Sequence, residues 1–125
     1  MIILDTSVWI EFLKANTAYF NTISSLLEQR EILAVECVFG ELLQGVKTEK
    51  EQGIILKYWE HLPKIDNADI IIEAGKYSRK NKLLDKGVGL IDAVILVHGI
   101  RSASKIWTLD KKLQRILPKD LIYKN

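Results

Sequence analysis

Short apolar runs alternate with helical patterns along this chain of 125 residues. Ile2–Leu4 is an apolar run that ends in an acid, and Ile32–Val35 and Lys105–Leu109 are short runs of the same kind. Such runs are typical of strands that are covered on both faces. Neighbouring parallel strands need a crossover, which a helix supplies. The sequence therefore predicts an α/β fold of three layers, with a central, mostly parallel sheet flanked by helices.

The segments between these runs have the spacing of amphipathic helices. We interpret Lys47–Gln52 as a polar loop, and Leu121–Tyr123 as a last edge strand. Leu90–Ile100 is apolar almost all round, so we expect this helix to be central and buried. The predicted helices are 7–14, 17–30, 38–46, 54–62, 68–84, 90–100 and 111–117, with an extended segment at 64–66 and inner positions at Ile71, Ile72, Gly75 and Tyr77.

Composition narrows the class of protein. Apolar residues make up 48% of the chain and charged residues 27%, and the length fits a single domain over 1–125. The only cysteine, Cys37, cannot form an internal disulfide, so we expect a reducing cytoplasm. No apolar run is long enough for a membrane span or a signal peptide. The net charge of +2 does not by itself indicate a polyanionic partner.

Four acids stand where predicted strands end or predicted helices begin. Asp5 follows the first strand and Asp110 follows the strand Lys105–Leu109, while Glu41 and Asp92 lie near the starts of two helices. In open parallel sheets, ligands bind outside the carboxyl ends of the strands. We therefore expect these four carboxylates to converge at one edge of the sheet.

The four acids have apolar neighbours in the sequence, and no basic residue lies within those apolar flanks. Clustered, buried carboxylates raise one another's pKa and need a compensating charge. Mg²⁺ or Mn²⁺ prefers oxygen ligands of this kind and would supply that charge. Such a site suits phosphodiester hydrolysis, because a metal lowers the pKa of bound water and stabilises the developing negative charge. Four carboxylates could hold one ion or two.

Each of the four acids could also have a purely structural role. An aspartate at a strand end or a helix start often serves as a cap for free N–H groups, and that role fits each acid taken alone. Asp66 also ends a strand-like segment, and Asp85 lies beside a glycine-containing break. We interpret Asp66 as a cap and Asp85 as a loop acid, although spacing alone does not exclude them from the site.

Four motifs follow one another in the chain: Ile2–Ser7, Glu41–Gly45, Gly89–Ala93 and Trp107–Asp110. As an ordered set they resemble the motifs of PIN-domain nucleases, and among these the VapC-type toxins of type II toxin–antitoxin systems. The resemblance covers essentially the whole chain. It implies a Mg²⁺-dependent endoribonuclease that cleaves single-stranded or loop RNA, is held inactive by a small antitoxin protein and forms a homodimer.

The resemblance also implies roles for single residues. The four acids would hold the metal directly or through water: Asp5, Glu41, Asp92 and Asp110. Thr6, Ser7 and Thr108 would orient a carboxylate or a bound water. Many relatives have a further acid two residues after the fourth one, where this chain has Lys112. The resemblance therefore leaves the number of metal ions open.

Two basic runs could hold an RNA backbone through charge attraction. One lies at 79–82, and the other comprises Lys111, Lys112 and Arg115. Only the second adjoins a predicted metal ligand, so we assign RNA contact to it, with a solvated helix face as the alternative.

Aromatic and histidine residues allow weaker inferences. Trp9, Phe12 and Leu13 could line a groove for an antitoxin helix or pack in the core. His61 and His98 have no pattern of acids or nucleophiles nearby, so we interpret both as structural.

Two other classes of function compete with a nuclease. An aspartate-based phosphatase would need a second aspartate two positions after Asp5, where Ser7 stands, and a receiver domain would need an N-terminal acidic pair that is missing. A catalytically inactive RNA- or protein-binding module is the other alternative. The intact set of four acids argues against that module.

Overall fold

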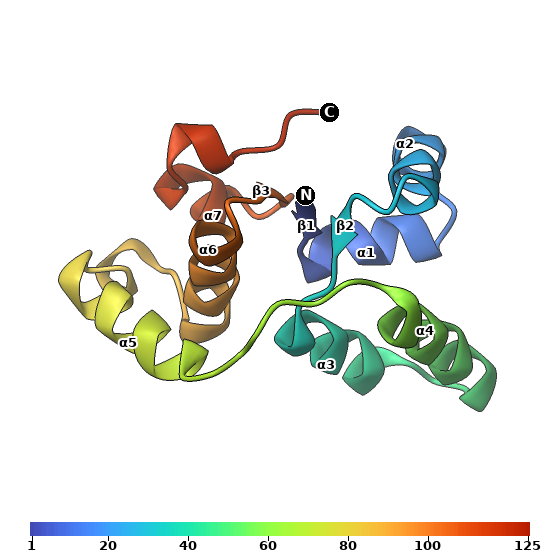
Figure 1. Ribbon diagram of the computed structural model, residues 1–125, viewed down its shortest axis with the longest axis horizontal. Coiled ribbons are helices and arrows are strands. Elements are labelled where there is room, and N and C mark those ends of the chain that lie inside the picture. The colour runs from blue at the N-terminus through green and yellow to red at the C-terminus, as the bar shows by residue number, and fades with distance from the viewer.

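The computed structural model describes residues 1–125 and contains three strands and seven α-helices (Figure 1). None of the helices has both the length and the apolar character that a membrane span requires. Two 3₁₀ turns complete the chain, η1 (Leu84–Lys86) and η2 (Lys119–Leu121). In chain order the strands and α-helices are β1 (Ile2–Leu4), α1 (Thr6–Leu13), α2 (Thr17–Glu28), β2 (Ile32–Leu33), α3 (Glu36–Gly45), α4 (Glu49–His61), α5 (Ile70–Lys80), α6 (Leu90–Ser102), β3 (Lys105–Trp107) and α7 (Lys111–Ile116).

The sheet has the order β2-β1-β3, and all of its strands are parallel. Ile2 pairs with both Ile32 and Lys105, and Leu4 pairs with Trp107. Because parallel strands end at the same edge, the residues that follow β1 and β3 lie side by side. The predicted α/β class with a parallel sheet is confirmed.

Isolated parallel bridges extend the sheet on both sides, from Ala34 to Lys64 and from Ile106 to Ile122. The extended segment predicted at 64–66 therefore reaches the sheet through one residue. The strand predicted at 121–123 is likewise reduced to one bridge, because η2 occupies the residues just before it. β2 and β3 both end two residues earlier than predicted.

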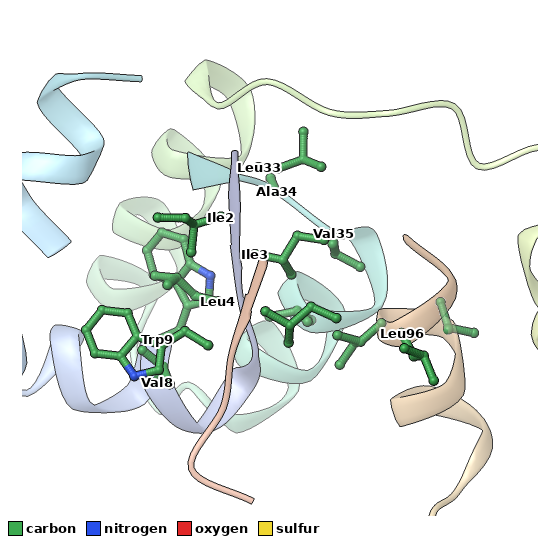
Figure 2. Close-up of a cluster of buried hydrophobic side chains, with 14 of the residues drawn as sticks. Ile2, Ile3, Leu4, Val8, Trp9, Leu33, Ala34, Val35 and Leu96 are labelled. Carbon is green, nitrogen blue, oxygen red and sulfur yellow. The ribbon is translucent and has the colours of Figure 1, made fainter. Parts of the chain in front are cut away.

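Side chains of β1 alternate between two apolar layers. In Figure 2, Ile2 and Leu4 point to the side of Trp9 in α1, whereas Ile3 points to the side of Leu96 in α6. All five side chains are buried. Each large apolar side chain that leaves water contributes roughly 1.5–3 kcal/mol to folding. The sheet is therefore held between helices on both faces, which confirms the predicted layers.

The middle of α6 is the central helix of the protein. Every residue from Ala93 to Gly99 is buried, as predicted, whereas Leu90, Ile91 and Ile100 at its ends are exposed. Gly99 lets α6 approach β3, because a Cβ atom at this position would lie 2.7 Å from Cδ1 of Ile106. Any larger residue would push the helix away from the sheet.

The start of α4 differs from the sequence prediction. The segment Lys47–Gln52 is not a loop throughout, since α4 begins at Glu49. The N–H of Glu51 donates to Oγ1 of Thr48 at 3.1 Å, and the Glu51 carboxylate accepts from the N–H of Lys47 at 3.4 Å. Thr48 and Glu51 have the Thr-x-x-Glu spacing of a capping box. The capping box can be read from the sequence, but the polar composition of the segment favoured the prediction of a loop.

The phase and length of α5 also differ from the prediction. The helix covers Ile70–Lys80 rather than 68–84, and it buries Ile70 and Ala74 against α6. Ile71 and Ile72, predicted to be inner positions, have exposed fractions of 59% and 65%. Gly75 is also exposed, while Tyr77 is half-buried and packs against the core. Three consecutive isoleucines fit more than one helical phase, and packing against α6 selects one of them.

Candidate functional site

Asp5 lies directly after β1, and its carboxylate is held at both oxygens. Oδ1 accepts hydrogen bonds from the N–H of Val8 at 3.2 Å and from the Ser7 hydroxyl at 2.5 Å. Oδ2 accepts a hydrogen bond from the Thr108 hydroxyl. Burial raises the pKa of Asp5, and the hydrogen bonds from Ser7, Thr108 and Val8 oppose that rise. Asp5 is thus the N-cap of α1 and a fixed, 95% buried carboxylate at the edge of the sheet.

The pairing of β1 with β3 explains the contact between Asp5 and Thr108. Leu4 pairs with Trp107, and the N–H of Asp5 donates to the carbonyl of Trp107 at 3.1 Å. The residue directly after β3 is Thr108, and its hydroxyl lies beside the Asp5 carboxylate. Residues that are more than a hundred positions apart in the chain are joined here by strand register.

The loop Leu109–Asp110 is held by the same pair of hydroxyls. The N–H of Asp110 donates to Oγ1 of Thr108 at 3.0 Å, and the N–H of Leu109 donates to Oγ of Ser7 at 3.1 Å. Oδ1 of Asp110 accepts from the N–H of Lys112 at 2.8 Å, which makes Asp110 the N-cap of α7. Ser7 and Thr108 therefore connect the loop that carries the fourth acid to the carboxylate of Asp5.

Glu41 lies on α3, which packs against α1. The Thr6 hydroxyl donates to Oε1 of Glu41 at 2.7 Å. Thr6 is the residue directly after Asp5, so this bond ties the second acid to the start of α1. All three hydroxyls that the sequence singled out, those of Thr6, Ser7 and Thr108, bond to a carboxylate of the set.

Asp92 lies in the first turn of α6 and is half-buried. Its pKa is raised from 3.8 to about 6, first by burial and then by the negative charges of Asp110, Asp5 and Glu41. Asp92 is therefore within electrostatic reach of all three other acids. The four residues that the sequence selected lie around one region at the carboxyl edge of the sheet.

The four acids do not form a finished coordination cluster. No three His, Cys, Asp or Glu side chains lie in positions that could hold a metal ion as they stand. No basic side chain neutralises the acids either, since the one ion pair of the chain joins Arg101 to Glu73. Oxygen donors with uncompensated negative charge fit a hard divalent cation. Its binding would require the side chains to turn toward it.

The two acids that the sequence left open lie elsewhere. Asp66 accepts a hydrogen bond from the N–H of Ala68 at 2.9 Å and acts as a local cap, as expected. Asp85 is exposed in η1 and accepts no side-chain hydrogen bond. Neither acid contributes to the raised pKa of Asp92.

Cys37 is a neighbour of the acids that sequence reasoning did not place there. Its thiol pKa is raised to about 11, first by burial and then by Glu41, with a smaller effect from Asp92. The thiol is therefore neutral and adds no charge to the site. Its position one helical turn before Glu41 was the available signal, because residues four apart share a helix face.

An apolar groove of about 490 Å³ between α1, α3 and α4 ends at Glu41. Trp9 and Phe12 are buried in the core, so of the three residues considered for a partner groove only Leu13 lines this one. The other apolar residues of the groove are Ile10, Leu42, Val46, Ile54 and Ile55.

The basic residues predicted to contact RNA lie on α7. Lys111, Lys112 and Arg115 are all exposed. Lys112 and Arg115 line a common pocket, whereas Lys111 lies outside it.

Comparisons with known proteins identify the family of this chain. The PIN domain family matches residues 2–117. The chain is 30% identical over 118 residues to Ribonuclease VapC32 of Mycobacterium tuberculosis (strain CDC 1551 / Oshkosh), a match that covers 91% of this chain and 88% of that protein. VapC32 of strain ATCC 25618 / H37Rv matches equally well.

A solved structure has the same fold. The crystal structure of VapBC2 from Rickettsia felis bound to a DNA fragment from their promoter contains a chain that superposes with a TM-score of 0.74 at 26% identity. The superposition covers 100% of this chain and 98% of that chain. The family match, the sequence relative and the shared fold agree with the four motifs, and the chain therefore belongs to the PIN-domain family, within its VapC type.

Proposed function

We propose that this protein is a Mg²⁺-dependent endoribonuclease and the toxin of a type II toxin–antitoxin pair. Its substrate would be RNA, and the bonds hydrolysed would be phosphodiester bonds. The family match and a relative that is named a ribonuclease support the nuclease activity. The proposed metal ligands are the four acids of the candidate site: Asp5, Glu41, Asp92 and Asp110.

The observation that carries this proposal is the unneutralised charge of the four acids. The pKa of Asp92 is raised to about 6 by burial and by three neighbouring carboxylates, and none of the four forms an ion pair with a lysine or arginine. Holding such charges together costs free energy unless a cation joins them. A divalent cation that prefers oxygen ligands, Mg²⁺ or Mn²⁺, fits this requirement.

Each acid has a different task in the proposed site. Asp5 is the most rigid ligand, because Ser7 and Thr108 fix its two oxygens. Glu41 is steadied by Thr6. Asp92 accepts no hydrogen bond within the chain, so it is the carboxylate freest to turn toward an ion or to exchange a proton with water.

When bound, a divalent cation supplies positive charge that acidifies water and offsets the charge developing on the scissile phosphate. The chain itself need not provide a nucleophile under this proposal. Thr6, Ser7 and Thr108 keep the carboxylates oriented, as positioning residues do around metal sites.

We propose that the apolar groove beside α1 binds the antitoxin. The Rickettsia felis structure contains VapBC2, which supports an antitoxin partner for this chain. A helix or strand with one apolar face would cover the side chains of Ile10, Leu13 and Ile54, each of which is more than a third exposed. Because Glu41 lines the same groove, a bound segment would reach the acids and hinder access to them.

We also propose that the protein works in the cytoplasm as a homodimer. The single unpaired cysteine suits a reducing compartment. An apolar face on α5 and α6, with η1 beside it, exposes Ile71, Ile72, Leu84, Leu90 and Ile91. Each of these side chains is more than 40% exposed, and apolar surface of this kind is what the core of a specific interface buries. A second copy packed through this face would cover it symmetrically.

Cleavage of RNA tests the nuclease proposal directly. The purified protein should cut RNA with Mg²⁺ or Mn²⁺ and stop when EDTA is added. Asp5→Asn and Asp92→Asn should each lower kcat by about 100-fold or more, because each removes a charged ligand. Asp66→Asn, a cap outside the site, should cut like the native chain. Cleavage that persists in EDTA and in both site variants, with folding verified by circular dichroism, would reject the mechanism.

Thermal unfolding without metal tests the electrostatics of the site. The pKa of Asp92 is raised in the folded state, so its ionisation opposes folding above about pH 6 and has no effect below about pH 4. Asp92→Asn should therefore raise Tm at pH 8 in EDTA by about 3–5 °C, or about 1 kcal/mol after solvent screening, and should change little at pH 4. Added Mg²⁺ should stabilise the native chain and not the variant. A variant that is less stable than the native chain at pH 8 in EDTA contradicts this account.

Growth assays test the antitoxin proposal. Expression of the native chain alone should arrest growth, and the small protein encoded beside it should relieve the arrest. Leu13→Glu places a charge in the groove, so it should keep nuclease activity and escape that relief. Harmless expression of the native chain would count against a toxin, and full relief of Leu13→Glu would count against the groove.

Sedimentation measurements test the dimer. The native chain should sediment as a dimer at high micromolar concentration, and Ile72→Glu should sediment as a monomer because it buries a charge in the proposed contact. Ile10→Glu, which lies in the other apolar groove, is the matched control and should remain dimeric. A monomeric native chain, or a dimeric Ile72→Glu, would overturn this assignment.

A further inference from the structure

Three basic side chains from two parts of the chain meet in one pocket. The pocket has a volume of about 430 Å³ and is lined by Lys86, Lys112, Arg115 and Ile116. Lys86 belongs to η1, whereas Lys112 and Arg115 lie three residues apart on one face of α7. The sequence grouped Lys111 with the two residues of α7; Lys111 does not line this pocket, whereas Lys86 does.

The backbone at Gly87 holds Lys112 in this pocket. A Cβ atom at position 87 would lie 3.2 Å from Cδ and 3.5 Å from Nζ of Lys112, so the lysine side chain lies along the glycine. Gly87 has a φ of 78°, a left-handed conformation that glycine adopts without strain. The Lys112 side chain therefore passes close to Gly87, the residue directly after Lys86, while Lys112 remains exposed.

No acid neutralises these three charges. The pocket has no carboxylate in its lining, and the one ion pair of the chain, Arg101 with Glu73, lies elsewhere. Like charges that share a pocket repel one another, and a bound anion removes that cost. Arginine and lysine side chains together are typical of phosphate sites.

The pocket is linked to one of the four acids, Asp110, through the first turn of α7. Oδ1 of Asp110 accepts a hydrogen bond from the N–H of Lys112, so a proposed metal ligand and a pocket residue are two positions apart and directly bonded. All three basic residues are exposed, and a polymer could cross the pocket without being threaded into it. An anion held here would therefore lie next to the site of the reaction.

We propose that Lys86, Lys112 and Arg115 bind a backbone phosphate of the RNA substrate, next to the phosphate that is cleaved. The inference rests on the proposed nuclease function and adds the residues that hold the substrate. The three are positioning residues, since they hold RNA without touching the reacting atoms. A free phosphate or mononucleotide offers the same chemistry as a backbone phosphate, and the experiment separates these sources.

The test is the binding of fluorescein-labelled single-stranded RNA, followed by anisotropy in EDTA so that no cleavage is needed. The variant Lys86→Ala/Lys112→Ala/Arg115→Ala should weaken binding by about 10-fold or more, and its plot of log Kd against log salt should be less steep by about 2, or about 0.7 per lost contact. The matched control Lys57→Ala/Lys119→Ala/Lys124→Ala removes the same number of charges from exposed positions outside the pocket. It should change Kd by less than about two-fold.

In cleavage assays the pocket variant should raise KM by a similar factor and leave kcat nearly unchanged.

Equal RNA affinities of the two triple variants would overturn the proposal that this pocket binds RNA, even if the native chain cleaves RNA. Loss of affinity in the pocket variant alone would support the pocket, even if the native chain cleaves nothing. Displacement of RNA by micromolar inorganic phosphate at constant ionic strength would indicate a free-phosphate site and overturn the RNA assignment, and failure of millimolar phosphate to displace RNA would support it.

Discussion

The parallel register of β1 and β3 is the constraint on which the candidate site depends. It aligns Leu4 with Trp107, so that the next residues, Asp5 and Thr108, meet at the edge of the sheet. A shift of one residue would turn every side chain of β1 to the opposite layer and separate this pair. The buried Asp5 carboxylate also needs the hydroxyls of Ser7 and Thr108, because a buried charge without hydrogen bonds is costly. The same contacts thus stabilise the fold and position the acid.

The sequence predicted those parts of the fold that depend on local pattern. The apolar runs and the helical spacing were enough to identify the parallel sheet and nearly every helix. The phase of α5 was not predictable, since Ile70, Ile71 and Ile72 are equivalent until α6 buries one of them. The start of α4 was predictable in principle, because Thr48 and Glu51 form a local cap that requires no tertiary information. The phase of α5 therefore depends on packing against another helix, whereas the start of α4 is determined by residues close together in the sequence.

The sequence pointed to the four acids because Asp5 and Asp110 follow parallel strands that end at one edge, and because Glu41 and Asp92 lie on helices near that edge. The contacts that orient them could not be derived in the same way. The bond from Thr6 to Glu41 depends on the packing of α1 against α3, and the approach of Cys37 depends on the phase of α3. Lys86 joins the basic pocket only because η1 folds back against α7. Contacts of this kind join residues that are far apart in the chain, and no repeating pattern in the sequence predicts them.

Lys112 lies two residues after Asp110 and is the basic residue nearest in sequence to that acid apart from Lys111. An ammonium group among four carboxylates would neutralise part of their charge and compete with a cation. Lys112 forms no ion pair with Asp110, although the two residues are joined through a backbone N–H, and its side chain lies along Gly87 instead. Gly87 has a left-handed φ and no Cβ atom, so it leaves room for the Lys112 side chain in this position. Under the proposed function, the carboxylates are then free to bind a metal ion, and Lys112 is free to bind a phosphate of the RNA. The first turn of α7 carries both a metal ligand, Asp110, and a phosphate-binding residue, Lys112.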